Sequence, residues 1–162
     1  MKHLFAVATL GLLPWAAIGQ TIPATPIPLE KEFINPTTLP RSLPGYSQAV
    51  AVRGGRTIYV AGQVGANPQG ELLGRGDLRT QLTQALRNLT AALAAAGATP
   101  ADVVKLNYYV VNYRPELLPL IREVRNEVFT MPDKRPASTL VGVAALYQEG
   151  VLVEVEAVAV TK

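Results

Sequence analysis

The chain has 162 residues and a net charge of +3, from 15 basic and 12 acidic side chains, and this length suits one domain with a full hydrophobic core. It has no cysteine and one histidine, His3, near the amino terminus, so the domain lacks the usual proton shuttle at neutral pH, the thiolate nucleophile and the commonest zinc ligands, and no metal site is expected. The basic side chains are scattered, without a run that would follow a phosphate backbone, so no nucleic-acid partner is expected.

Residues 1–19 have the pattern of an export signal peptide. A positive residue near the start is followed by an apolar run over 4–17, and small residues precede an expected cleavage site between Gly19 and Gln20. Pro14 interrupts the run, which is too short for a comfortable membrane span, although a retained interfacial anchor is an alternative. We expect a periplasmic or secreted protein that has no membrane association after cleavage.

Residues 20–43 form a proline-rich stretch, and residues 44–162 form the expected domain. The stretch has little periodic hydrophobicity, which predicts an extended arm between the export signal and the domain. At the start of the domain, two strands are expected at 47–53 and 57–64, joined by a turn at Gly54-Gly55.

The clearest expected helix covers residues 77–96. Leucine and alanine recur there at three- and four-residue intervals, on one side of a helix, and Gly97 is placed to cap its carboxyl end. A second helix is expected from near Pro115. Further strands are predicted at 103–112, 138–145 and 151–160. This order predicts an α+β sandwich in which two helices pack on one face of a mixed β-sheet.

Several short segments, read in order, carry a resemblance to a known family. They are 45–50 (Gly-Tyr-Ser-Gln-Ala-Val), 60–64 (Val-Ala-Gly-Gln-Val), 94–99 (Ala-Ala-Ala-Gly-Ala-Thr), 102–105 (Asp-Val-Val-Lys), 136–139 (Pro-Ala-Ser-Thr) and 153–157 (Val-Glu-Val-Glu-Ala). From about residue 35 to residue 160, the chain resembles the RidA family of reactive-intermediate enamine/imine deaminases, also called YjgF-like proteins. The resemblance implies a chorismate-mutase-like fold and a homotrimer with ligand clefts between subunits. It also implies hydrolysis of 2-aminoacrylate and related imines to 2-oxo acids and ammonia, without a metal or an organic cofactor.

Three residues match site positions of that family. The resemblance implies that Tyr46 lines the cleft, that the backbone of Gly62 lines it too, and that Glu154 is the catalytic residue that orients the attacking water. Each has a structural alternative: a half-buried tyrosine at a strand edge, a close-packed bend in a strand, and an acid that alternation places in solvent beside Glu156.

Residues 136–139 depart from the family pattern. Active members have Pro-Ala-Arg-Ser, whose arginine makes a bidentate contact with the substrate carboxylate, whereas this chain has Pro-Ala-Ser-Thr. Ser138, through its hydroxyl and backbone amide, and Thr139 are therefore the candidate substrate-binding residues here. A further hypothesis is that Arg122, on the second helix, reaches the same cleft and replaces the missing arginine; Arg125 lies one helical turn further along. An Arg122 guanidinium directed to solvent, away from the cleft, would contradict this hypothesis.

Three functions are compatible with these residues. The first is an exported hydrolase that binds small imino or oxo acids between subunits and hydrolyses enamines or imines with a water positioned by Glu154. The second is a trimer that binds a small molecule without turnover, which the missing family arginine favours. The third is endoribonuclease-like activity, described for some family members, although the chain offers no imidazole pair for acid–base cleavage of RNA and no basic stripe with interleaved aromatic residues.

Overall fold

The computed structural model describes residues 27–40 and 45–162. The expected signal peptide, the beginning of the proline-rich arm and its last residues lie outside these ranges. In the part of the chain that the structure describes, no helix is both long enough and apolar enough to cross a membrane.

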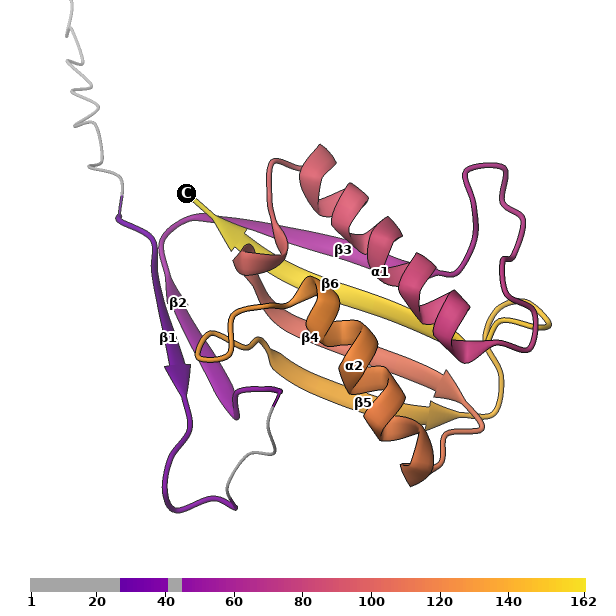
Figure 1. Ribbon diagram of the computed structural model, residues 1–162. Helices are drawn as coiled ribbons and strands as arrows, with labels where there is room; N and C mark the ends of the chain where they lie inside the picture. Colours follow the sequence, from indigo (N-terminus) through magenta and orange to yellow (C-terminus); the bar gives the residue numbers. More distant parts are fainter. Residues whose placement is uncertain (1–26, 41–44) are drawn as a thin grey trace, which may run out of the picture.

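A four-stranded sheet forms the centre of the domain, in the order β3 (Arg56–Val64), β6 (Val153–Thr161), β4 (Val103–Val111) and β5 (Ala137–Val143). β4 and β5 run parallel, whereas β6 is antiparallel to both β3 and β4, so the sheet is mixed. Helices α1 (Leu78–Ala95) and α2 (Leu118–Val128) cover the same face of this sheet (Figure 1). This arrangement confirms the expected α+β fold, with two helices on one face of a mixed sheet.

The hydrophobic core lies between this sheet and the helices. Alternate residues of β6 face the helices and are buried, and α1 covers them with the fully buried side chains of Leu82, Leu86, Leu89 and Leu93. The stripe of leucines expected on the first helix therefore forms one wall of the core.

Local sequence sets both ends of α1. The carboxylate of Asp77 accepts hydrogen bonds from two amides of the first turn, which satisfies donors that a helix leaves free. At the other end, Gly97 has a φ of +75°, and the amide of Ala98 donates to the carbonyl of Leu93 at 2.8 Å. This is a Schellman-type cap, and it ends the helix where the glycine predicted an end.

The first two strands differ from the expectation. β1 (Glu30–Ile34) lies within the proline-rich arm, where no strand was predicted, and it pairs antiparallel with β2 (Ala49–Arg53) in a separate two-stranded sheet. β2 and β3 are still connected through Gly54 and Gly55 but do not pair with each other: β2 pairs with β1, and β3 pairs with β6. The reason is local: the residues of β1 contain no proline, so their amides are free to pair with β2.

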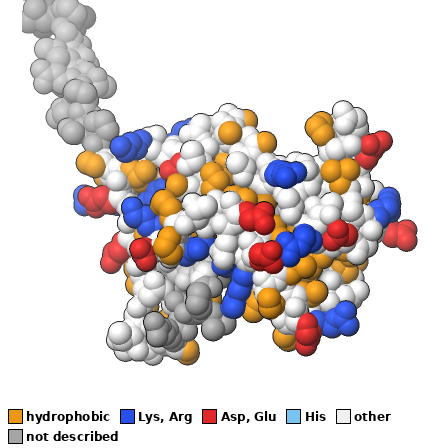
Figure 2. Space-filling model, viewed as in Figure 1, with side chains coloured by type: hydrophobic (Ala, Val, Ile, Leu, Met, Phe, Trp, Pro, Cys, Tyr) orange, Lys and Arg blue, Asp and Glu red, His pale blue; other side chains and the backbone are white. Residues whose placement is uncertain are grey.

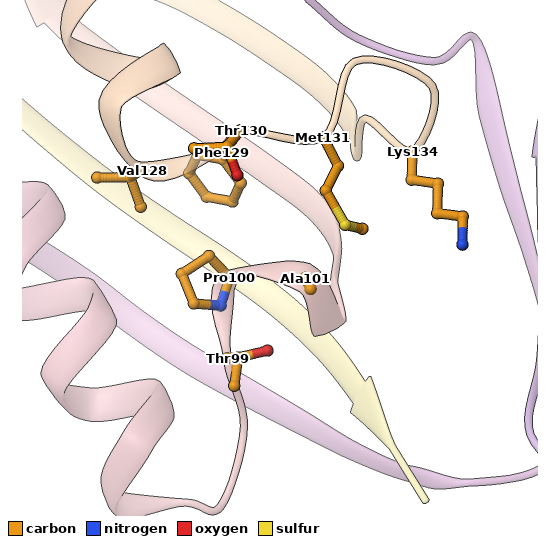
Figure 3. Close-up of a pocket in the computed structure, with 8 residues that line it drawn as sticks. All are labelled: Thr99, Pro100, Ala101, Val128, Phe129, Thr130, Met131 and Lys134. Atoms are coloured by element: carbon orange, nitrogen blue, oxygen red, sulfur yellow. The ribbon is translucent and has the colours of Figure 1, made fainter.

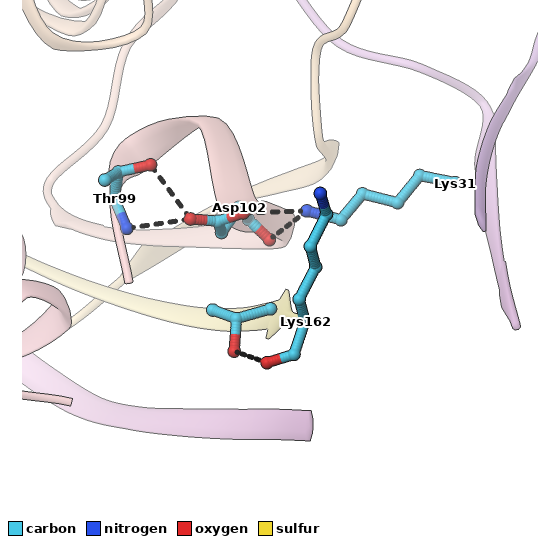
Figure 4. A network of polar contacts seen from close by, with 5 residues as sticks. Lys31, Thr99, Asp102 and Lys162 are labelled. Carbon is cyan, nitrogen blue, oxygen red and sulfur yellow. Dashed lines mark hydrogen bonds and ion pairs between the residues drawn. The ribbon is translucent and has the colours of Figure 1, made fainter. Parts of the chain in front are cut away.

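A polar network joins β1 to the main domain (Figure 4). The Nζ atom of Lys31 lies 3.2 Å from Oδ1 of Asp102, in the short 3₁₀ helix η1 (Pro100–Asp102). The other oxygen of Asp102 accepts from the amide and the hydroxyl of Thr99, at 3.0 and 2.9 Å. Asp102 therefore caps its own turn and holds the strand that precedes the domain.

Candidate functional site

Neighbouring side chains of β5 point to opposite faces of the sheet. Ser138 lies opposite Leu106 of β4, and Thr139 lies opposite Asn107. Leu106 is fully buried beneath the helices, so Ser138 lies on the helix side. Thr139 lies on the face that the helices leave uncovered, here called the open face. These two candidate binding residues therefore do not share a cavity within one chain.

A cavity of about 330 Å³, here called the helix-side pocket, lies between β4, β5 and α2. Its lining residues are Tyr46, Tyr108, Tyr113, Leu118, Ile121, Arg122, Arg125, Ser138 and Leu140. Three of the predicted binding residues, Tyr46, Ser138 and Arg122, are thus brought together. Tyr46 is held there by its neighbour Ser47, whose amide and hydroxyl donate to two carbonyl oxygens just before β5, at 3.2 and 2.8 Å.

Arg125 lines this pocket but is not among the predicted site residues. Its side chain is 9% exposed, and its Nη2 atom donates to Oδ1 of Asn126 at 2.9 Å. Burial lowers the pKa of Arg125, and the positive charges of Arg135 and Arg122 act in the same direction. Helical spacing could have identified it, because it lies four residues after the buried Ile121, on the apolar side of α2.

Two polar atoms in the pocket lack protein partners. Within residues 27–40 and 45–162, the Nε atom of Arg125 and the hydroxyl of Tyr108 are buried and form no hydrogen bond. Burial also raises the pKa of Tyr108, so its hydroxyl stays protonated and can donate. Gly45 makes room for the guanidinium, because its φ is +131° and a Cβ there would overlap the Arg125 side chain.

On the open face, Glu154 lies against Gly62. β3 and β6 change register between Val60 and Gln63, and a side chain at position 62 would overlap the carboxylate of Glu154. Glycine therefore allows the carboxylate to lie over the backbone at this point. These two predicted site residues are side by side, but on the opposite face of the sheet from the helix-side pocket.

Glu156 differs from Glu154 although both face the same side of β6. Nδ2 of Asn107 and the hydroxyl of Tyr109 each donate to Oε1 of Glu156 at 2.8 Å. These hydrogen bonds hold the pKa of Glu156 below its usual value and raise the pKa of Tyr109. In the described part of the chain, the side chain of Glu154 makes no hydrogen bond or ion pair, so its carboxylate remains available to accept a hydrogen bond from water.

A second cavity, on the open face, is bordered by Lys105. Nζ of Lys105 donates to Oγ1 of Thr139 at 2.6 Å. The cavity has a volume of about 360 Å³ and is lined by Tyr59, Val60, Ala61, Lys105, Asn107, Glu156, Ala157 and Val158. It holds none of the predicted site residues, but it shows that the open face is hollowed beside Glu156.

A third cavity, of about 210 Å³, lies between η1 and the segment after α2 (Figure 3). Phe129 and Pro100 face each other across it, and Lys134 lies at its far end. Its walls are largely apolar, and none of the predicted site residues lines it.

The distribution of charge on the helix face and the placement of metal-ligating side chains bear on which ligands the protein can bind. Positive and negative side chains are interspersed on the face that carries the helices, without a continuous basic track (Figure 2). Among the residues that the structure describes, no group of three or more His, Cys, Asp or Glu side chains is placed to hold a metal ion.

The predicted site residues thus fall into two groups. Tyr46, Ser138 and Arg122 lie in the helix-side pocket, and Gly62 and Glu154 lie on the open face, as does Thr139. Arg122 is therefore close to Ser138, as the replacement hypothesis requires, but is separated from Gly62 by the sheet.

The chain has relatives over most of its length. The family model described as Endoribonuclease L-PSP matches residues 37–161. A 2-iminobutanoate/2-iminopropanoate deaminase from Dermatophagoides farinae is 37% identical over 130 residues, which cover 80% of this chain and 96% of the relative. A crystal structure of a Rid-family protein of unknown function from Yersinia pestis is 44% identical, with a TM-score of 0.76, and covers 81% of this chain and 98% of its own. The crystal structure of RidA from an Antarctic Psychrobacter is 33% identical, with a TM-score of 0.57, and the match covers 80% of this chain and 99% of the Psychrobacter chain.

Proposed function

The chain belongs to the Rid family, whose model is described as Endoribonuclease L-PSP, and from that premise we propose that it binds small imino or oxo acids and hydrolyses imines to a carbonyl compound and ammonia. The match with the deaminase from Dermatophagoides farinae covers 96% of that relative and 80% of this chain, which supports the proposal. The observation that carries it is the unpaired carboxylate of Glu154 lying against Gly62.

The reaction needs one water and two proton transfers. The water oxygen bonds to the imine carbon while the nitrogen gains a proton, which gives a carbinolamine; loss of ammonia then leaves the C=O group. Glu154 accepts a hydrogen bond from that water, takes its proton as the C–O bond forms and delivers this proton to the imine nitrogen. It then takes the hydroxyl proton of the carbinolamine and delivers it to the amine, so that the C–N bond breaks and ammonia leaves as the C=O group forms. Because imines hydrolyse readily, positioning of water and substrate supplies much of the acceleration, and no histidine is needed.

The two groups of site residues call for two copies of the chain. Since Glu154 and the helix-side pocket lie on opposite faces of one sheet, we propose that a homotrimer places Glu154 of one copy beside the pocket of the next. The open face supports this, because it exposes apolar surface: Tyr59 is 81% exposed and Val141 is 40% exposed.

The test of catalysis compares Glu154→Gln with the wild type. Imines are generated in situ from amino acids by an amino-acid oxidase, and release of the 2-oxo acid is followed. Loss of the proton acceptor should lower kcat/KM by about 100-fold or more, a usual contribution of general acid–base catalysis. Glu149→Gln is the matched control, since Glu149 is exposed and lines none of the three cavities described above. Equal rates for the wild type and Glu154→Gln, or no acceleration of any imine, would overturn the proposed hydrolysis.

A second candidate function is binding without turnover, and Ser138 at the position of the family arginine favours it. A ligand screen by thermal shift should then find a small acid that raises Tm although no imine is hydrolysed. RNA cleavage is not proposed, because the chain has one histidine and so offers no imidazole pair for acid–base cleavage.

We also propose that the chain is exported, on the strength of residues 1–19 alone. Fractionation of producing cells followed by amino-terminal sequencing should yield a mature protein that begins at Gln20. A protein that keeps Met1 and stays in the cytoplasm would contradict export and leave the proposed chemistry untouched.

A further inference from the structure

Arg125 is a buried cation without a counter-charge. The residue is 9% exposed, and in the described ranges no carboxylate forms an ion pair with its guanidinium. Among the residues that the structure describes, its guanidinium donates one hydrogen bond, to the neutral amide oxygen of Asn126. Burial of a charge is costly unless the charge is paired, so a folded protein seldom keeps such an arginine without a use.

The surroundings of Arg125 add positive charge and free donors. Arg122 lines the same pocket, and Arg135 is close enough to act on the charge of Arg125. The Nε–H of Arg125 and the hydroxyl of Tyr108 are both buried without partners among the described residues. A carboxylate in the pocket would pair with the charge and accept from these donors, which matches the planar geometry of an arginine.

The remaining walls of the helix-side pocket are apolar or aromatic. Tyr46, Tyr113, Ile121 and Leu140 surround a volume of about 330 Å³. A cavity of about 150 Å³ already accommodates benzene in another protein. The pocket therefore has room for an acid with a ring or a branched chain, and an acid of two or three carbons would leave most of these walls uncovered.

We propose that Arg125 is the anion anchor of this protein, in place of the arginine missing at Ser138, and that the pocket takes carboxylates that carry an aromatic or branched apolar group. Binding of such acids does not depend on catalysis; that their imines are the substrates rests on the proposed function. The anchor thus lies on the buried side of α2 instead of on β5, and both elements line the helix-side pocket.

The test measures binding by isothermal titration calorimetry, with phenylacetate as the probe and phenylacetamide as its neutral counterpart. In the wild type, phenylacetate should bind about tenfold or more tightly than both phenylacetamide and acetate, because the amide lacks the charge and acetate lacks the ring. In Arg125→Met, the preference for the acid over the amide should disappear. Arg125→Lys should keep part of it, since the charge remains without the bidentate geometry.

Two further arginine variants locate the effect. Arg87→Met, on the exposed side of α1, should bind phenylacetate like the wild type. Arg122→Met should weaken phenylacetate less than Arg125→Met does, because Arg122 is only partly buried. Ser138→Arg in the Arg125→Met background should restore binding, since Ser138 lines the same pocket. This rescue, with circular dichroism and Tm of each variant, separates loss of the anchor from loss of the fold.

The proposed anchor and the proposed hydrolysis fail separately. Equal binding of acid and amide to the wild type, or unchanged phenylacetate affinity in a folded Arg125→Met variant, overturns the anchor even if imines are hydrolysed. Arg125-dependent binding of phenylacetate without hydrolysis of any imine supports the anchor and overturns only the catalytic proposal.

Discussion

Gly62 has no side chain at the point where Glu154 lies over the β3–β6 pair. The atoms that a Cβ at this position would meet belong to the end of the glutamate side chain, which is flexible and can move aside. Ser138 and Arg125 form a second pair: β5 has no positive charge at Ser138, but α2 provides one at Arg125, in the same pocket. In the first pair a missing side chain makes space for a carboxylate, and in the second a missing charge on the strand is matched by a charge on the helix.

Gly62→Ala is expected to separate activity from stability. The added methyl group displaces the carboxylate of Glu154 at little cost in packing, so the unfolding free energy should change by less than about 1 kcal/mol. Displacement by about 1 Å can lower a rate by about 100-fold, so imine hydrolysis should fall strongly. Gly70→Ala adds a methyl group that meets no atom, and although its φ of +82° makes the substitution cost some stability, this variant should keep its activity. A fully active Gly62→Ala enzyme would contradict the role of this contact.

At the scale of elements, the arm strand β1 depends on a few contacts with the rest of the chain. Its backbone pairs with β2, and Lys31 reaches Asp102 at the start of β4. Partial burial opposes ionisation of Asp102, but hydrogen bonds from Thr99 and the charge of Lys31 outweigh it and hold the pKa of Asp102 below its usual 3.8. The ionised form of Asp102 therefore stabilises both η1 and the attachment of β1.

Asp102→Asn should lower the unfolding free energy by about 1 kcal/mol at neutral pH, a typical value for a partly exposed cap and ion pair. Because the pKa of Asp102 is depressed in the folded protein, the stabilisation is present above the unfolded pKa and is lost as the pH falls through the lower, folded value. Urea denaturation of both proteins should therefore give curves that converge at acidic pH. Asp133→Asn, at an exposed acid, should match the wild type throughout. A difference that grows with acidification would contradict the role of Asp102.

At the scale of the molecule, the helices cover one face of the sheet and leave the other open (Figure 1). The open face carries exposed Tyr59 and Val141 beside a hollow of about 360 Å³. A trimer would cover this apolar surface and bring Glu154 to the pocket of a neighbouring copy. The proposed site therefore exists only in the assembly.

Tyr59→Glu should prevent assembly of the proposed trimer and abolish the proposed imine hydrolysis, because burial of an unpaired carboxylate at a subunit interface is strongly unfavourable. Light scattering gives the mass in solution, and circular dichroism checks that the monomer stays folded. Tyr147→Glu is the control: Tyr147 is 71% exposed but lies in the loop before β6, so mass and activity should be unchanged. A trimeric and active Tyr59→Glu variant would rule out the open face as the interface.

Most elements of the fold could be predicted from local patterns. The leucine spacing of α1, the cap at Gly97 and the apolar alternation of β4 and β6 each repeat over many residues, so isolated exceptions do not obscure them. β1 was not predicted, because a five-residue strand between prolines has little pattern of its own. The pairing of β2 was equally hidden, since a Gly-Gly turn does not reveal which neighbour a strand will choose.

The candidate site was predictable only where a residue matches the family by position. Tyr46, Gly62, Ser138 and Glu154 could be named this way, but not their division between two faces, which follows from the register of β5 against β4. Arg125 was not predicted as a site residue, because a single arginine among the apolar residues on one side of a helix gives no sign that it is buried. Its burial depends on the space left by Gly45, far away in the sequence.

By itself, the sequence determined the α+β class, the helices and their caps, and the family, because these rest on periodicity, local hydrogen bonding and motifs. Only the tertiary structure decided which of the candidate residues meet. Strand register, the packing of α2 on the sheet and the path of the chain at Gly45 are long-range contacts, and no local pattern encodes them. They place a buried, unpaired arginine in one pocket and a free carboxylate on the opposite face.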